Sequence, residues 1–253
     1  MNETTDRLAR RLEQAERLLF ITGAGMSADS GLPTYRGIGG LYEGVETAEG
    51  MSIEEALSGT TMRRDPALCW KYIMQIEKAC RGAEPNAGHR AIAALQRRFA
   101  EVWVLTQNVD GLHREAGSAQ VIDIHGDVRK LACMACTWRR AVTDYAELSC
   151  PPRCPECDAI VRPEIVLFGE MLPLDKLAVL QRELERGFDA VFSIGTSSVF
   201  PYIAQPIIEA RFRGALTVEI NPGDSEVTHV VEEKITHGAS ETLASLCRSL
   251  GIT

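Results

Sequence analysis

The sequence predicts an α/β protein built on a doubly wound parallel sheet, with a smaller second domain. Short apolar runs alternate with helical patterns, which is typical of a parallel sheet covered by helices on both faces. Two stretches interrupt this alternation, a helical one at 38–82 and a cysteine-rich one at 128–161. We expect these two to pack together as the small domain. The remainder would form a Rossmann-like sheet domain from residues 1–37, 83–127 and 162–253.

Composition and charge narrow the class of protein. With 253 residues, 45% apolar and 25% charged, the chain resembles an ordinary globular protein with one large core and a modest satellite. A net charge of −8 provides no basic surface, so we expect no nucleic-acid partner. No apolar run reaches membrane-spanning length, and the polar start at Met1–Asp6 lacks signal-peptide features. We therefore expect a cytoplasmic monomer with no membrane partner.

The individual elements follow from apolar spacing and end signals. Runs rich in Val, Ile, Leu and Phe predict buried strands at 18–21, 101–106, 121–124, 189–195 and 215–221. Amphipathic spacing predicts helices at 5–17, 52–62, 66–80, 85–98 and 241–250, with another between the last two strands. Asp65 is placed to cap the helix that begins at Pro66.

A glycine-rich loop, Thr22 to Gly37, follows the first strand. Gly23 and Gly25 allow a tight turn and close backbone approach by a ligand. Amides at the start of a following helix would suit a phosphate, and Ala28 stands where a dinucleotide fingerprint has its third glycine. Taken alone, this loop fits a nucleotide site and an ordinary strand-to-helix turn equally well.

The end of the same loop strengthens the nucleotide interpretation. Tyr35 and Arg36 lie among Gly31, Pro33 and Gly37, which break any regular helix. An aromatic ring and a guanidinium on such a loop would make a lid with a flat wall and a phosphate clamp.

Polar side chains follow two other predicted strands. Gln107, Asn108 and Asp110 come directly after 101–106, and His125 follows 121–124. The carboxyl ends of parallel strands line the ligand crevice of an open sheet, so these groups are placed to hold a sugar and an amide. Alternatively, Asn108 and Asp110 cap the next helix. His125 is suited to proton transfer near neutral pH. We expect structural roles for the other histidines, His89, His113, His229 and His237.

Four cysteines predict a structural zinc site. They form two Cys-x2-Cys pairs separated by 17 residues: Cys133, Cys136, Cys154 and Cys157. Four thiolates fill a tetrahedral shell and leave no open position for chemistry. The alternative is a set of reduced, free cysteines. Cys150 is a competing ligand, but its pairing with Cys154 is wider and stiffened by proline, so we favour Cys157. We expect buried apolar roles for Cys69, Cys80 and Cys247.

In their order along the chain these motifs resemble those of the sirtuins, the NAD-dependent protein-lysine deacylases. The glycine loop resembles the family's opening motif, with Tyr35 where Phe is usual and Asp29 where Glu is common. Residues 107–110 resemble the Gln-Asn-(Ile/Val)-Asp motif of the nicotinamide-ribose pocket, and His125 matches the catalytic histidine. The match extends from Leu18 to Leu250.

Four later segments add to the resemblance. Arg162–Glu170 is similar to a segment that pairs with the substrate peptide as an added strand, although a plain core strand fits its periodicity as well. Gly195–Val199 and Asn221–Pro222 resemble the adenosine-binding half of the site. Gly238–Ala239 would approach adenine through the backbone.

The resemblance implies a role for each of these positions. Catalysis would fall to His125 and Asn108. NAD, a consumed co-substrate, would be held by Gly23, Ala24, Gly25, Ser27, Asp29, Tyr35, Arg36, Gln107, Asn108, Asp110, Gly195, Thr196, Ser197, Asn221 and Ala239. The acylated-lysine peptide of the partner protein would be held by Val166, Phe168, Gly169, Glu170 and Val199.

The implied reaction removes an acyl group from lysine and releases nicotinamide and O-acyl-ADP-ribose. The acyl oxygen would attack C1′ of the ribose as nicotinamide leaves, and His125 would then act as general base toward a ribose hydroxyl. Family members that prefer succinyl groups carry Tyr-x-x-Arg, whereas here Tyr72 is followed by Gln75, so we expect acetyl first. Two alternatives remain, a protein mono-ADP-ribosyltransferase and a non-catalytic NAD-binding module.

Overall fold

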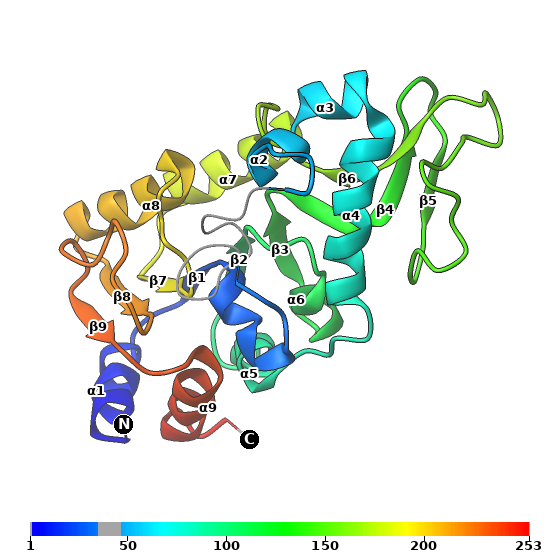
Figure 1. The fold of residues 1–253 in the computed structure, drawn as a ribbon. Helices are drawn as coiled ribbons and strands as arrows, with labels where there is room; N and C mark the ends of the chain where they lie inside the picture. Colours follow the sequence, from blue (N-terminus) through cyan, green and yellow to red (C-terminus); the bar gives the residue numbers. More distant parts are fainter. Residues whose placement is uncertain (1, 35–46, 253) are drawn as a thin grey trace.

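A computed structural model describes residues 2–34 and 47–252 and shows a parallel sheet with a smaller antiparallel sheet at one end (Figure 1). The strand order is β3-β2-β1-β7-β8-β9, and every neighbouring pair is parallel. The bounds are β1 Arg17–Thr22, β2 Glu101–Thr106, β3 Gln120–Asp123, β7 Ala190–Ile194, β8 Leu216–Ile220 and β9 Glu233–Ile235. All five predicted strands are present, and β9 is an addition.

Helices cover both faces of the large sheet, which confirms the doubly wound class. Alternate residues of β1 point to opposite faces: Leu18 and Phe20 join one core cluster, Leu19 and Ile21 another. The first cluster contains side chains of α1 Asn2–Arg11, α5 Ala87–Leu95 and α9 Ala239–Ser249; the second, those of α7 Leu174–Arg186 and α8 Pro201–Phe212. Burial on both faces explains why the strands read as unbroken apolar runs.

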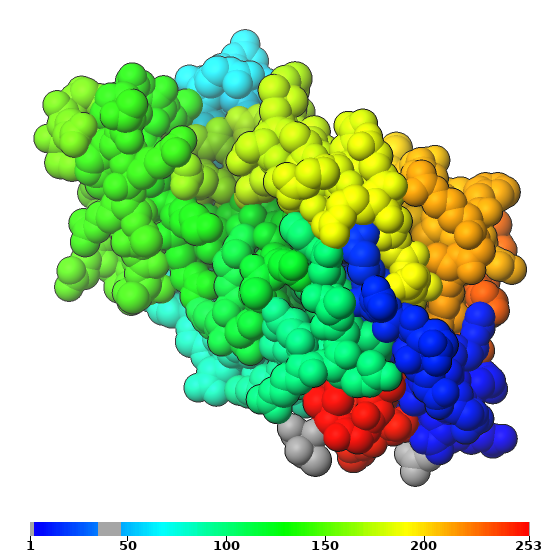
Figure 2. All heavy atoms as spheres, turned by 180° about the vertical axis from the view of Figure 1, so that it is seen from behind, coloured from blue at the N-terminus to red at the C-terminus, as the bar shows by residue number. Residues whose placement is uncertain are grey.

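The N- and C-terminal helices lie side by side against one face of the sheet. Seen from behind, α1 (blue) and α9 (red) are adjacent, while the cysteine-rich segment (green) stands at the opposite end of the molecule (Figure 2). The helix α7 was not predicted. No helix in the described ranges has the length and apolar character needed to cross a membrane.

The helical and cysteine-rich stretches pack together, as predicted. A three-stranded antiparallel sheet, β5-β4-β6, is built from β4 Gly126–Cys133, β5 Arg139–Ala141 and β6 Val161–Ile165. Beside it lie α2 Ile53–Ala56, α3 Gly59–Arg64 and α4 Pro66–Cys80. Trp70 of α4 donates from Nε1 to the Val161 carbonyl at 2.9 Å, and its ring lies 5.5 Å from that of Tyr145. The exact domain boundaries given above stay a prediction.

Several helix bounds differ from the predicted ones. At Ser58 and Asn86 the reason is that a side chain caps the backbone. The predicted 52–62 helix is divided into α2 and α3, since Ser58 accepts from the Thr61 amide at 3.0 Å and starts a new helix. The helix expected from Pro85 begins after Asn86, whose side chain accepts from the Gly88 amide. Asp65 caps α4 as predicted, and α1 ends at Arg11 rather than at residue 17.

The described part of the glycine loop, residues 22–34, contains no α-helix. Two short 3-10 helices take its place, η1 Ala24–Met26 and η2 Ala28–Ser30. The helix expected after the two glycines is therefore 3-10 here, with only a small helix dipole, and the binding of a phosphate at its amides stays a prediction. A one-turn helix, α6 Leu112–Glu115, follows β2.

The strand order reverses between β1 and β7: the chain continues from β1 toward β3 on one side and from β7 toward β9 on the other. The ladder of backbone bonds continues one residue past the strands: Gly23 donates to the Ile194 carbonyl and Gln107 to that of Thr22, both at 3.0 Å. These bonds fix the first loop residues level with one another at the carboxyl edge of the sheet. Ligands bind at such a switch point in open α/β sheets.

The loops after β1 and β7 touch backbone to backbone. The Gly25 amide donates to the Gly195 carbonyl at 2.9 Å. A Cβ on Gly25 would lie 2.7 Å from the Gly195 Cα, and one on Gly195 would lie 2.5 Å from the Gly25 carbonyl carbon. The glycines that we expected to admit a ligand thus also allow two loops to meet, and their role toward a ligand stays a prediction.

This contact yields a matched stability test. Gly195 and Gly214 both have left-handed backbone, with φ of +55° and +81°, but only Gly195 faces another backbone within 4 Å. Alanine at either position costs about 1–2 kcal/mol for its conformation. We expect Gly195→Ala to lower the free energy of unfolding in urea by at least about 1 kcal/mol more than Gly214→Ala, because it also overpacks. Equal losses would show that the two loops can separate freely.

Candidate active site

Asn108 lies at the centre of the carboxyl edge of the sheet and is 5% exposed. Its Nδ2 donates to the Gly23 carbonyl and to Ser27 Oγ, both at 3.0 Å. Its own amide donates to Thr106 Oγ1 at 3.1 Å. The side-chain amide therefore joins the loop after β2 to the loop after β1, and both of its N–H groups are used within the protein. The oxygen Oδ1 is the end of this amide that remains for a ligand.

Asp110 extends this network toward α6. Ser27 Oγ donates to Asp110 Oδ2 at 2.7 Å, and the Leu112 amide donates to Oδ1 at 3.0 Å. Asp110 thus accepts from the first residue of α6 and also holds Ser27, but the N-cap position of that helix is Gly111 and not Asp110. Burial raises the pKa of Asp110, and the bonds from Leu112 and Ser27 oppose that rise.

Thr196, in the loop after β7, is hydrogen-bonded to residues in the loops after β2 and β8. Gln107 Nε2 donates to Thr196 Oγ1 at 2.8 Å, and Asn221 Nδ2 donates to the Thr196 carbonyl at 3.1 Å. The Ser198 amide also donates to Oγ1, at 3.1 Å. Residues assigned to the two halves of the predicted NAD site are thus linked directly. Ser197, which lies between Thr196 and Ser198 in the sequence, is exposed.

His125 follows β3 by two residues, in the turn that leads into β4. Its Nδ1 lies 3.0 Å from the Gln107 carbonyl oxygen. A carbonyl only accepts, so Nδ1 carries the hydrogen and Nε2 is the basic nitrogen. Burial lowers the pKa of His125; the Gln107 carbonyl opposes this and the positive charge of Lys176 adds to it. The ring is therefore neutral at pH 7 and able to accept a proton.

A mostly apolar pocket lies between this edge of the sheet and α4. Its polar groups come from Ser27, Asn108 and Asp110. The complete lining is Ala24, Ser27, Leu32, Pro33, Ile76, Ala79, Cys80, Asn108, Val109 and Asp110. Few polar groups in an apolar concavity are typical of a small-molecule site. Four of the predicted NAD-binding residues meet here.

One expectation for α4 needs correction. Cys80 is half-buried and lines the pocket, instead of being a core residue; burial raises the pKa of its thiol to about 12, so it stays protonated. Tyr72 is buried with its hydroxyl on Glu49, and Gln75 is exposed. Neither is in the pocket lining. Three residues of α4 line the pocket at helical spacing: Ile76, Ala79 and Cys80.

Other predicted NAD residues lie around this centre. Asp29 is exposed on η2, and its Oδ2 would lie 3.9 Å from a Cβ on Gly238, the residue before α9. This places Asp29 beside the start of the helix whose first residue is Ala239. Tyr35 and Arg36 lie outside the described residues.

The predicted peptide-binding segment bridges the site and the small domain. After β6, the Val166 amide donates to the His125 carbonyl at 2.8 Å and the Phe168 amide to that of Leu57 at 3.0 Å. Val166 and Phe168 are half-buried, whereas Gly169 and Val199 are exposed. The backbone here is thus partly occupied within the protein, and the predicted pairing with a peptide stays a prediction.

Glu170 has a local role that the sequence did not reveal. Arg162 donates to both of its carboxylate oxygens, at 2.6 and 2.9 Å, and the Leu167 amide adds a third bond at 2.9 Å. Burial would raise the pKa of Glu170, but these bonds outweigh it and the pKa is lowered. The carboxylate therefore fixes the turn that follows Phe168.

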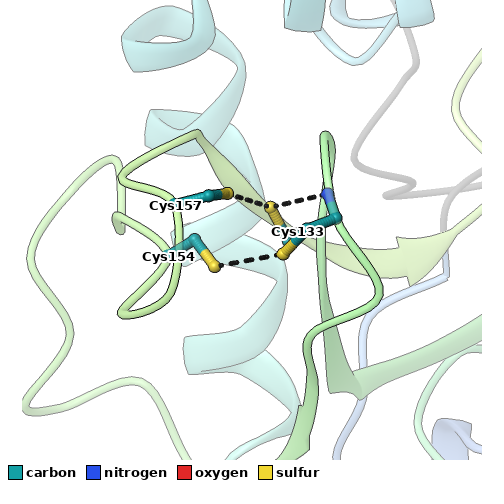
Figure 3. A group of neighbouring side chains, drawn as sticks. Cys133, Cys154 and Cys157 are labelled. Carbon is teal, nitrogen blue, oxygen red and sulfur yellow. Dashed lines mark hydrogen bonds between the residues drawn. The ribbon is translucent and has the colours of Figure 1, made fainter.

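The four predicted cysteines form one cluster. All their sulfur atoms lie within 4.8 Å of one another, with Cys133 3.4 Å from Cys157 and Cys136 3.6 Å from Cys154. A tetrahedron of sulfurs around zinc has edges of about 3.8 Å, so the cluster fits that metal. Figure 3 shows Cys154 and Cys157 facing the Cys133 loop. Cys150 is exposed and outside the cluster, which confirms the choice of Cys157.

The remaining cysteines and histidines mostly follow expectation. Cys69 and Cys247 are buried. His89 and His113 are buried with ring centroids 4.7 Å apart, and His113 Nε2 lies 3.0 Å from Thr22 Oγ1. Tyr202 was missed, because nothing in the spacing of α8 links it to His125, although its Oη lies 2.7 Å from Nε2.

The fold and site define a doubly wound α/β protein with a pocket at the carboxyl edge of its sheet and a cluster of four cysteines that fits zinc. Residues 23–201 match the model of the Sir2 family. The chain is 51% identical to NAD-dependent protein deacylase 2 of Pseudomonas aeruginosa, over 93% of both chains. It is 36% identical to NAD-dependent protein deacylase 1 of Archaeoglobus fulgidus, over 96% of both. The chain belongs to the Sir2 family.

Solved structures agree with this assignment. A Sir2 homologue in complex with NAD has a TM-score of 0.86 at 33% identity, with 97% of this chain and 93% of that one covered. A Sir2 protein with a deacetylated p53 peptide and 3′-O-acetyl ADP-ribose has a TM-score of 0.88 at 26% identity, with 98% and 99% covered.

The metal site leads to a paired test with two serine variants. Cys157→Ser removes a sulfur from the cluster, whereas Cys150→Ser removes one outside it. After dialysis against a weak chelator, we expect about one zinc per chain in the parent and in Cys150→Ser, and loss of zinc from Cys157→Ser. Atomic absorption measures the content. Loss from Cys150→Ser alone would reverse the assignment.

Proposed function

We propose that this protein removes acyl groups from protein lysine, with NAD as consumed co-substrate and with nicotinamide and O-acyl-ADP-ribose as products. The strongest support for the proposal is the position of His125. Its neutral ring, with Nε2 as the basic nitrogen, lies at the same edge of the sheet as the pocket beside Asn108. Relatives over nearly the whole chain are named NAD-dependent protein deacylases, which supports the same reaction here.

Bound NAD would supply an electrophilic sugar carbon and nicotinamide as leaving group. Asn108 and Asp110 would hold the nicotinamide end, in a pocket whose apolar walls exclude water. His125 would accept a proton at Nε2 from a sugar hydroxyl, since Nδ1 is already committed to the Gln107 carbonyl.

We extend the proposed NAD site along the sheet edge. Gly23, Ala24, Gly25 and Ser27 would face the phosphates, with Tyr35 and Arg36 as the lid. The adenosine half would lie over Gly195, Thr196, Ser197, Asn221 and Ala239, with Asp29 beside it. The direct bonds of Thr196 to Gln107 and Asn221 support one continuous site.

The acylated-lysine peptide would lie along Val166–Glu170 and Val199. Exposure of Gly169 and Val199 beside the half-buried Val166 and Phe168 supports this placement. Tyr72 of α4 is followed three residues later by Gln75, where succinyl-preferring family members carry an arginine, so no guanidinium at that position would pair with a succinyl carboxylate. We therefore propose a preference for acetyl groups. Zinc on the four clustered cysteines would hold the small domain together.

The setting of the protein is also a proposal. A cluster of reduced thiols suits a reducing compartment, which favours the cytoplasm. The net charge of −8 disfavours nucleic acid, and we propose a monomer with no membrane partner.

The test is nicotinamide release from NAD in the presence of acetyl-, succinyl- and long-chain-acyl-lysine peptides. We expect release that depends on peptide, fastest with acetyl, and a deacylated product by mass spectrometry. His125→Ala should lower deacetylation by on the order of a hundredfold or more.

Three results would contradict the proposal. A clear succinyl preference would overturn the acyl assignment. ADP-ribose retained on a protein partner would indicate the transferase alternative instead. His125→Ala deacetylating at the parent rate would remove the histidine from the mechanism.

A further inference from the structure

Both ring nitrogens of His125 are engaged within the protein. Nδ1 lies 3.0 Å from the Gln107 carbonyl oxygen, and Nε2 lies 2.7 Å from the hydroxyl oxygen of Tyr202. Because Nδ1 holds the hydrogen, Nε2 of the neutral ring has only a lone pair to offer. The Tyr202 hydroxyl is therefore the donor in this bond. The nitrogen that would take the proton is the one that the tyrosine holds.

Aromatic packing places Tyr202 for this bond. It is the second residue of α8, and its ring stacks on that of Phe200 with centroids 5.4 Å apart and planes 13° apart. The His125 ring stands nearly perpendicular to both, at 88° to Phe200 and 80° to Tyr202. The imidazole is thus fixed by a carbonyl on one side and by a pair of stacked rings on the other.

A tyrosine hydroxyl has a property that suits this position. It can donate to a neutral imidazole and, after rotation of its hydrogen, accept from an imidazolium. Since Nε2 has a single lone pair, the tyrosine hydrogen must turn away when a sugar hydroxyl donates its proton there; the tyrosine oxygen can then accept from Nε2–H of the charged ring. A carboxylate could not serve both states equally, because it would favour the charged ring.

We propose that Tyr202 is a positioning residue for His125: its hydroxyl fixes the orientation of the imidazole in the free protein and yields the Nε2 lone pair when the sugar hydroxyl donates its proton. The inference rests on the proposed function, in which His125 is the general base. Tyr202 acts through the histidine, so its loss should affect the step that needs the base and spare the step that releases nicotinamide.

The direct test is nitrogen NMR of the free protein, labelled at its five histidines. His125→Ala identifies the His125 signals. Tyr202→Phe removes the hydroxyl and keeps the ring that stacks on Phe200. We expect the Nε2 signal of the neutral ring to move toward the position of an imine nitrogen that accepts no hydrogen bond, while Nδ1 stays protonated.

The kinetic test separates the two steps. Exchange of labelled nicotinamide into NAD, with acetylated peptide present, reports the first step, and deacetylated product reports the whole reaction. We expect Tyr202→Phe to leave exchange and the KM for NAD within twofold, and to lower kcat for deacetylation roughly three- to tenfold, the size of one neutral hydrogen bond.

Tyr145→Phe is the matched control. Its hydroxyl donates to the Val128 carbonyl in the small-domain core, away from the His125 ring. We expect this variant to leave the His125 signals and the ratio of deacetylation to exchange unchanged. Thermal melting of both variants checks that each is folded.

The outcomes are distinguishable. An unmoved Nε2 signal in Tyr202→Phe, or equal loss of exchange and deacetylation, would overturn the positioning role. If the parent released no nicotinamide with any peptide, the proposed function would fail, while the NMR measurement would still decide whether Tyr202 holds His125.

Discussion

The structure depends on the contact between the loops after β1 and β7, where the Gly25 amide meets the Gly195 carbonyl at 2.9 Å. At this point the chain has run to one edge of the sheet through β3 and returns to the middle at β7. The two loops can lie this close only because neither residue has a side chain. Two side chains of the candidate site are hydrogen-bonded to these loops, Asn108 to Gly23 and Gln107 to Thr196.

Burial then sets the chemistry of the polar groups that the junction brings together. It raises the pKa of Asp110 and lowers that of His125, so both shifts favour the neutral form. Internal hydrogen bonds offset the cost of burying these groups, and they also determine which atoms remain for a ligand. For Asn108 that atom is Oδ1, and for His125 it is Nε2 once the Tyr202 hydroxyl turns its hydrogen away.

Much of this arrangement was predictable, for physical reasons that differ between elements. The five predicted strands of the large sheet are runs of apolar residues buried on both faces. Their positions therefore followed from the order of apolar residues in the sequence. The cysteine spacing fixed the ligands because four thiolates must reach one ion. The helix ends at Asn86 and Ser58 were less predictable, since side-chain capping competes with apolar periodicity. Tyr202 could not be found, because its contact with His125 joins residues 77 positions apart through tertiary packing.

A crystal structure of the protein soaked with NAD would test the central claim most directly. Our account predicts that the dinucleotide lies across the carboxyl ends of β1, β2 and β7, with its nicotinamide sugar facing Nε2 of His125. Density for NAD elsewhere on the protein, with the pocket beside Asn108 empty and the imidazole turned from it, would contradict the account.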